Sequence, residues 1–223
     1  MKAIIFDSGV LITFSMNSIL DLIRELKKGF DGKFIITHQV EYEIVQRPMT
    51  IKKYKLGALK VKSLIDEGIL EFPESLKISN KEIEDNTQDI LKQLNAIFYA
   101  NNHPVHLIDL GEASILALNS LLNKKGMQTV IAIDERTTRM LIEKPENLHK
   151  LMEEKLGAKI NIKSISHPSL KNVSFIRSSE LIYVAYRKGL VKDKEMLDAM
   201  LYGAKFKGCS ISFDEIKEIE SMA

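Results

Sequence analysis

Three short stretches of the chain are almost wholly apolar, a pattern typical of strands that are buried on both faces of a parallel sheet. These predicted strands span residues 3–6, 34–36 and 129–133. Residues 68–72 and the Lys/Ile-rich run at 158–165 predict two further short strands. A break at His167 and Pro168 follows the second of these.

Between the strands, apolar residues recur at every third or fourth position, which predicts amphipathic helices. Thr37 is expected to cap the second helix and Pro48 to end it. No helix is expected directly after Asp7. The predicted helices span residues 17–28, 38–47, 80–100, 111–124, 179–188 and 193–206, with a Lys-bearing helix between 49 and 67, one helix after residue 134 and a short acidic one at the end of the chain.

Strands alternate with helices along the chain, so we expect an α/β fold with a mostly parallel sheet flanked by helices. The 223 residues suffice for one large domain, and we expect a single domain over residues 1–223. Residues 49–105 are expected to form a helical insertion in this core.

Four carboxylates stand at matching places in this pattern. Asp7 and Asp134 directly follow buried strands, Glu43 lies beside the buried stripe of a helix, and Glu112 opens another helix. The carboxyl ends of parallel strands meet at one edge of a sheet, so these acids would repel each other unless a cation lay between them. Mg²⁺ and Mn²⁺ take oxygen ligands of this kind. The sequence therefore predicts a divalent-metal site suited to phosphoryl chemistry.

Each of these acids also has a purely structural interpretation. Asp7 and Asp134 could be turn or N-cap residues, as Asp commonly is between a strand and a helix. Glu43 could be a solvated residue at the margin of its stripe, and Glu41 competes with it for the site role. Glu112 has capping-box spacing with the acid three residues before it.

The segments that carry these acids, in this order, resemble the PIN-domain superfamily of metal-dependent ribonucleases. The C-terminal stretches at 179–190 and 197–200 are similar to a prokaryotic PIN-like branch. The resemblance covers the core but neither residues 49–105 nor about 143–177. The core segments are Asp7-Ser8, Val40-x-x-Glu43, Gly111-Glu112-Ala113 and Ile133-Asp134-Glu135-Arg136.

The resemblance implies a Rossmann-like sheet and an acidic pocket that binds Mg²⁺ or Mn²⁺ and cleaves single-stranded or structured RNA. Asp7, Glu112 and Asp134 would bind the metal, and Glu43 would bind a second ion or orient the attacking water. Glu112 stands where many active members have Asp. Many members are toxins, which implies an antitoxin-like protein partner, although this chain is longer than the usual compact toxin.

Five further residues are expected to support this site. Ser8 could hydrogen-bond a ligand carboxylate, and Asp109 and Glu135 are acids next to the predicted ligands. Arg136 and Arg139 could contact substrate phosphate, or equally form a solvated or salt-bridged helix face.

Charge and cysteine content limit the possible partners and the cellular compartment of the protein. The balance of 32 Lys plus Arg against 30 Asp plus Glu is too even to argue for nucleic acid, so only local clusters can. The single cysteine, Cys209, fits a reducing cytoplasm and is expected to be a spectator. Neither a signal peptide nor a membrane span is expected.

One cluster of lysines could bind a nucleic-acid backbone or simply be a soluble helix face: Lys52, Lys53, Lys55, Lys60 and Lys62.

Two other functions fit parts of the sequence. A PIN-like fold without nuclease activity would be a nucleic-acid-binding or protein-binding module. Residues 5–12 also look like the opening motif of haloacid-dehalogenase-type phosphatases, but Gly9 stands where that chemistry needs a second Asp. The acidic C-terminal helix and apolar residues within 80–100 also permit a homodimer.

Overall fold

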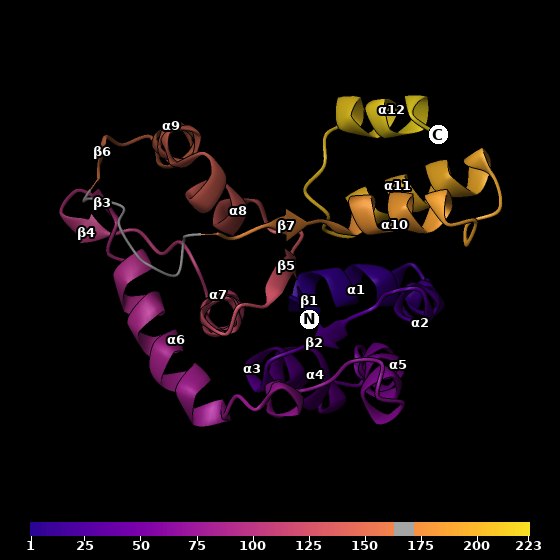
Figure 1. Cartoon of the computed structure of the whole chain (residues 1–223). Coiled ribbons are helices and arrows are strands. Elements are labelled where there is room, and N and C mark those ends of the chain that lie inside the picture. The colour runs from indigo at the N-terminus through magenta and orange to yellow at the C-terminus, as the bar shows by residue number, and fades with distance from the viewer. Residues whose placement is uncertain (163–171) are drawn as a thin grey trace.

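The computed structural model describes residues 1–162 and 172–223 and is built around a four-stranded parallel sheet. The strands are, in spatial order, β2 (Lys33–Ile35), β1 (Lys2–Phe6), β5 (Gln128–Ala132) and β7 (Phe175–Ile176). Helix α7 (Leu110–Lys124) covers one face of this sheet, and α1 (Ser8–Met16) and α2 (Leu20–Lys28) cover the other (Figure 1). The predicted α/β fold is confirmed, and the three apolar runs correspond to β1, β2 and β5.

The segment after β2 is one helical rod made of α3 (His38–Glu41), the π-helical turn η1 (Tyr42–Gln46) and α4 (Arg47–Met49). Thr37 caps it as predicted, because its Oγ1 accepts a hydrogen bond from the Val40 N–H at 3.2 Å. The prediction that Pro48 ends the helix is wrong, since Pro48 lies inside the last turn. The π turn widens the helix just before Pro48, which gives the proline ring room beside the preceding carbonyls.

The region predicted as a helical insertion contains strands as well as helices. Helix α5 (Lys55–Asp66) is the Lys-bearing helix, and the strand predicted at 68–72 reduces to one parallel bridge between Glu71 and Ile35. A short 3₁₀ turn, η2 (Pro73–Leu76), precedes α6 (Asn80–Leu94). The helix predicted over 80–100 thus ends early.

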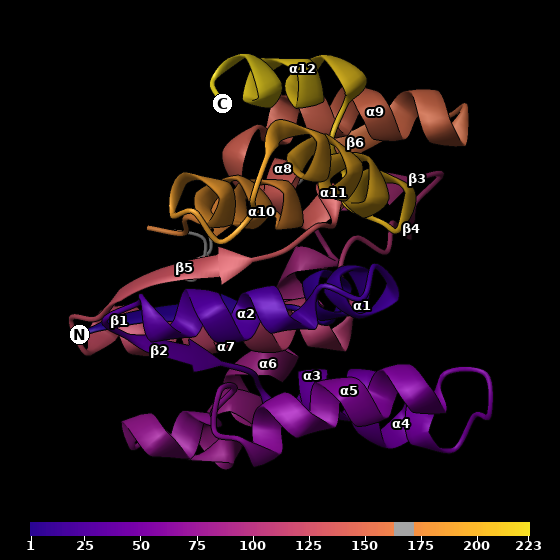
Figure 2. The same ribbon diagram turned by 90° about the vertical axis from the view of Figure 1, so that its right-hand side faces the viewer.

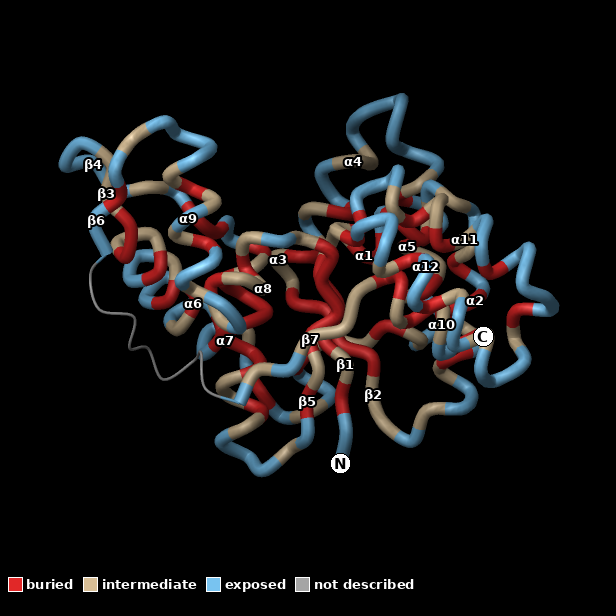
Figure 3. The backbone as a smooth tube through the Cα atoms, turned by 90° about the horizontal axis from the view of Figure 1, so that it is seen from above, coloured by how far each residue is buried: buried red, intermediate tan, exposed pale blue. Residues whose placement is uncertain are grey.

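The chain after α6 enters a second, antiparallel sheet that the sequence did not predict. Its strands are β4 (His103–Pro104), β3 (Phe98–Ala100) and β6 (Ile160–Ile162), the last within the predicted run at 158–165. With α6 and α9 (Pro145–Leu156), this sheet forms an arm on the side of the molecule away from α2 (Figures 1 and 3). The predicted break at His167 and Pro168 lies outside the described residues.

Helices occupy both edges of the parallel sheet. The rod α3 to α4 and helix α5 lie beyond the β2 edge, and three C-terminal helices lie beyond the β7 edge (Figure 2). In the described ranges, no helix combines the length and the hydrophobicity needed to cross a bilayer. The C-terminal helices are α10 (Ser178–Arg187), α11 (Lys194–Phe206) and α12 (Phe213–Ser221), and α8 (Arg136–Glu143) follows β5.

Candidate functional site

Asp7 joins β1 to α1, and its carboxylate caps that helix. Its Oδ2 accepts a hydrogen bond from the Gly9 N–H at 2.9 Å, and the residue is only 5% exposed. Helix α1 begins at Ser8, so the prediction that no helix follows Asp7 directly is wrong. The cap explains where the carboxylate lies, but it does not explain why the group is buried beside other acids.

Asp134 follows β5, and its carboxylate is held by two distant residues. Oδ1 accepts a hydrogen bond from the Ser178 N–H at 2.8 Å. Oδ2 accepts hydrogen bonds from the hydroxyls of Thr13 at 2.9 Å and Ser178 at 2.7 Å. The cap of α8 is instead Glu135, whose Oε2 accepts from the Thr138 N–H at 2.7 Å. Asp134 therefore ties β5 to α1 and α10, a role that no local pattern in the sequence indicates.

Glu112 and Asp109 form the predicted capping arrangement at the start of α7. The Asp109 N–H donates to Glu112 Oε2 at 2.6 Å. The Asp109 side chain is 81% exposed and lies 2.7 Å from His106 Nε2. Glu112 is thus turned toward the protein, whereas the Asp109 carboxylate faces solvent.

Glu43 lies in the π-helical turn and packs directly against the first turn of α7. Its Oε1 accepts a hydrogen bond from Gln39 Nε2 at 2.9 Å. A Cβ added to Gly111 would lie 2.6 Å from Glu43 Oε2, so only glycine permits this approach. The competing acid, Glu41, instead accepts a hydrogen bond from Gln46 Nε2 at 2.8 Å along the helix surface.

The four predicted carboxylates act on one another electrostatically. Burial, together with the charges of Glu43 and Asp134, raises the pKa of Asp7 to about 7, against opposing hydrogen bonds from the Gly9 and Ser8 N–H groups. Burial, together with the charges of Asp7 and other nearby acids, raises the pKa of Glu112 to about 8. These shifts mean that the fold crowds negative charge at the carboxyl edge of the sheet, where a cation would relieve it.

The donor chemistry of this acidic group fits a hard divalent cation, because every candidate ligand is a carboxylate oxygen. A Cβ added to Gly9 would lie 3.1 Å from Asp7 Oδ2 and 4.0 Å from Asp134 Cβ, so the glycine leaves space between these two acids. Within residues 1–162 and 172–223, however, no three His, Cys, Asp or Glu side chains are placed closely enough to hold an ion. A bound cation would therefore draw the carboxylates together.

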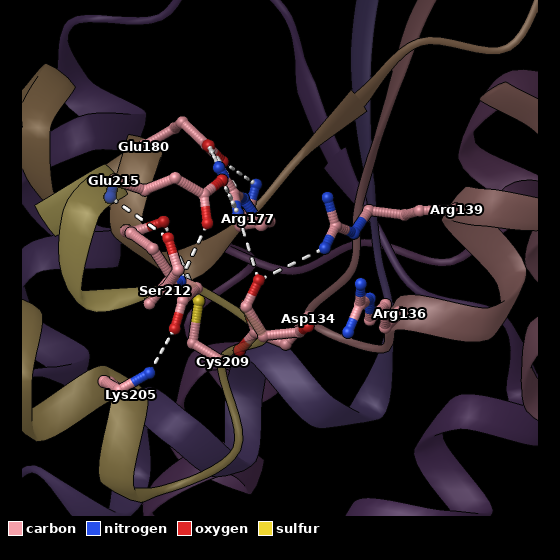
Figure 4. A network of polar contacts seen from close by, with 12 residues as sticks. Asp134, Arg136, Arg139, Arg177, Glu180, Lys205, Cys209, Ser212 and Glu215 are labelled. Atoms are coloured by element: carbon pink, nitrogen blue, oxygen red, sulfur yellow. Dashed lines mark hydrogen bonds and ion pairs between the residues drawn. The ribbon is translucent and has the colours of Figure 1, made fainter. Parts of the chain in front are cut away.

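Arg136 and Arg139 line a cavity of about 880 Å³ that Ser210 also borders (Figure 4). The Ser210 N–H donates to the Asp134 carbonyl at 3.1 Å. Arg139 donates to the Ser210 carbonyl at 3.2 Å and to the Glu135 carbonyl at 3.3 Å. None of the four acids lines this cavity. The arginines are therefore placed beside the acidic group rather than within it.

The predicted lysine cluster lies on and before α5, beside Glu43. It borders a second, largely apolar cavity of about 550 Å³ whose lining includes Glu43, Lys53, Tyr54 and Lys60. Lys62 is held by Asp66 at 2.6 Å, whereas the Lys53 ammonium lies over the Tyr54 ring at 5.2 Å from its centre. Most of the cluster is exposed and available to an anion.

Comparisons with protein-family models, curated proteins and solved structures returned no match to this chain. None of these comparisons therefore bears on the resemblance to PIN domains, which rests on the short motifs around the four acids.

Proposed function

We propose that this chain is a divalent-metal-dependent ribonuclease that hydrolyses RNA phosphodiester bonds with Mg²⁺ or Mn²⁺ bound at the acidic group. The observation that carries the proposal is the burial of Asp7 and Asp134, 5% and 2% exposed, on either side of Gly9 where β1 and β5 end at one edge of the parallel sheet. Burial and neighbouring acids also raise the pKa of Asp7 and of Glu112. Burying mutually repelling carboxylates destabilises a fold, and such sites are commonly functional. A divalent cation would turn this repulsion into attraction.

The roles of the residues follow from their positions. Asp7, Glu112 and Asp134 would hold the ion, which supplies polarisation of the phosphate and a lowered pKa for a bound water. Thr13 and Ser178 fix the orientation of the Asp134 carboxylate through their hydrogen bonds. Glu43, packed against α7, would accept a proton from the attacking water.

The proposed substrate is a single-stranded or structured RNA. The exposed lysines beside Glu43 support it, since cationic side chains bind the phosphate backbone without regard to sequence. The single cysteine supports a cytoplasmic setting, and the PIN-like motifs support an antitoxin-like partner. A homodimer stays a prediction.

The test is cleavage of a mixed RNA pool by purified protein with Mn²⁺, with Mg²⁺ and with EDTA. We expect metal-dependent cleavage by the wild type and by Asp31→Asn, a change to an exposed acid at the opposite end of the strands. The double variant Asp7→Asn plus Asp134→Asn should lose it. Equal cleavage by the wild type and the double variant would show that a contaminant, or another site, does the chemistry.

A binding module without nuclease activity is the second candidate, and one observation favours it. Both oxygens of Asp134 already accept hydrogen bonds from within the protein, as a purely structural carboxylate would. This alternative predicts RNA retention in EDTA without cleavage in any metal. A phosphatase of the haloacid-dehalogenase type is less well supported, since Gly9 cannot act as its general acid; trapping a phosphoaspartate at Asp7 would revive it.

A further inference from the structure

The cavity of about 880 Å³ is built by parts of the chain that the proposed ribonuclease chemistry does not use. It lies between α8, β7 and the starts or ends of the three C-terminal helices. Five cationic side chains and three carboxylates line it, together with several apolar ones. The cavity is therefore electropositive on balance and partly apolar.

The charge of Arg177 is neutralised by carboxylates that line the same cavity. Its guanidinium pairs with Glu180, with Nε and Oε1 at 2.7 Å, and with Glu215 at 2.8 Å (Figure 4). Its side chain is only 13% exposed. Arg177 and two of the three lining carboxylates thus satisfy one another, which leaves the other cations of the cavity with little compensation.

Arg139 forms no close ion pair with a described residue, although Glu143 and Glu180 lie near enough to act on its charge. Among the described residues, no carboxylate lies within ion-pair distance of it, and its hydrogen bonds go only to backbone carbonyls. Arg177 donates to the same Ser210 carbonyl at 3.0 Å, so two guanidinium groups converge on one oxygen (Figure 4). Burial, and then the charge of Arg177, lowers the pKa of Arg139. An anion in this cavity would compensate Arg139, because Arg177 is already paired with Glu180 and Glu215.

Arg136 lines the same cavity one helical turn before Arg139. Its Nε donates to the Met140 sulfur at 3.2 Å, a weak acceptor, and no described carboxylate pairs with it. Planar guanidinium groups one helical turn apart, neither of them in a close ion pair with a described carboxylate, match the multiply accepting oxygens of a phosphate group.

The apolar part of the lining offers a second kind of contact. Phe175 and Phe206 both border the cavity, and Phe206 is 70% exposed although it is a large apolar side chain. An exposed aromatic ring next to unpaired arginines suits a ligand with one flat apolar end and one anionic end. Bases stack on aromatic side chains with little sequence preference.

We propose that this cavity binds one nucleotide, with the phosphate on Arg136 and Arg139 and the base against Phe206 or Phe175. The nucleotide is either a free mononucleotide or one unit of an RNA strand. Neither a metal ion nor the four predicted ligands is needed for this binding, so the inference goes beyond the proposed ribonuclease activity and is independent of it.

The experiment is equilibrium titration of the full chain in EDTA with three probes: inorganic phosphate, adenosine 5′-monophosphate and a short single-stranded RNA. We expect the mononucleotide to bind at least about tenfold more tightly than phosphate, because stacking adds to the charged contacts. Arg136→Gln and Arg139→Gln should each weaken it about tenfold. Arg187→Gln, on the exposed far end of α10, is the matched control and should bind as the wild type does.

The probes also identify the source of the nucleotide. RNA binding that is tighter than mononucleotide binding, and equally sensitive to both arginines, assigns the cavity to a strand; equal affinities assign it to a free nucleotide. The proposal is overturned if the wild type binds neither the mononucleotide nor the RNA, or if both arginine variants bind as the wild type does. Arg136 is exposed, so its variant remains informative if Arg139→Gln does not fold. Asp7→Asn should bind normally, which separates this test from loss of nuclease activity.

Discussion

Replacing Asp7 by Asn should make the metal-free protein more stable at pH 8, although it removes a predicted metal ligand. The carboxylate is 5% exposed and lies near Glu43 and Asp134. An Asn side chain keeps an oxygen for the Gly9 N–H and is a good N-cap, so the start of α1 is preserved. Only the buried charge is lost.

The size of the effect follows from the pKa of Asp7, which rises from 3.8 to about 7 in the folded protein. Below pH 3.8 both states hold the proton and the group is neutral. Between pH 3.8 and about 7 the unfolded chain releases the proton while the folded chain keeps it, so the free energy of unfolding falls as pH rises. At about 1.4 kcal/mol for each pH unit, the loss reaches an upper limit of about 4 kcal/mol above pH 7.

The assay is urea denaturation in EDTA at several pH values between 4 and 8. We expect the wild type and Asp7→Asn to converge at low pH and the variant to gain about 2–4 kcal/mol over the wild type at pH 8. Asp31→Asn, at an exposed position, should show no such gain. A variant that is less stable at pH 8, or a difference that does not change with pH, would refute the account of the acidic group.

Three further predictions test the same group. Saturating Mn²⁺ at pH 8 should raise the melting temperature of the wild type clearly more than that of Asp7→Asn in a thermal-shift assay; equal shifts would argue against Asp7 as a ligand. Gly111→Ala should displace the Glu43 carboxylate and reduce the Mn²⁺-induced shift, while urea denaturation shows a stability change within about 1 kcal/mol, because alanine favours the helix. Thr13→Val should cost about 1.5–3 kcal/mol in urea denaturation, since it removes a buried hydrogen bond to the charged Asp134; a neutral result would contradict the geometry.

The parallel sheet was predictable because β1, β2 and β5 contain short apolar runs of strand length, each bounded by polar residues. Helix α1 was not predictable, since residues 8–14 are mostly apolar and the exposed positions Ile12 and Met16 are apolar too, which leaves no polar stripe to reveal a helical period. The antiparallel sheet was missed for a different reason. Its strands are two or three residues long, and β3 pairs with β6 about sixty residues later in the chain.

The acidic group was predictable in part. A carboxylate directly after a buried strand has to lie at the sheet edge, which placed Asp7 and Asp134 in the same region. The partners of Asp134 were not predictable, because Thr13 and Ser178 are 121 and 44 residues away from it. The closeness of Glu43 to α7 depends on Gly111, whose role appears only when the two helices pack.

Asp7 and Asp134 look equivalent in the sequence, but the structure separates them. Asp134 accepts three hydrogen bonds from Thr13 and Ser178, so its burial has a structural explanation. Asp7 and Glu112 have no comparable compensation, because burial and neighbouring acids raise the pKa of each. A side chain that destabilises the fold where a neutral residue would fit needs a reason outside the fold. A bound cation would therefore be compensated most at Asp7 and Glu112, and Asp134 is the proposed ligand whose position is fixed by hydrogen bonds within the protein.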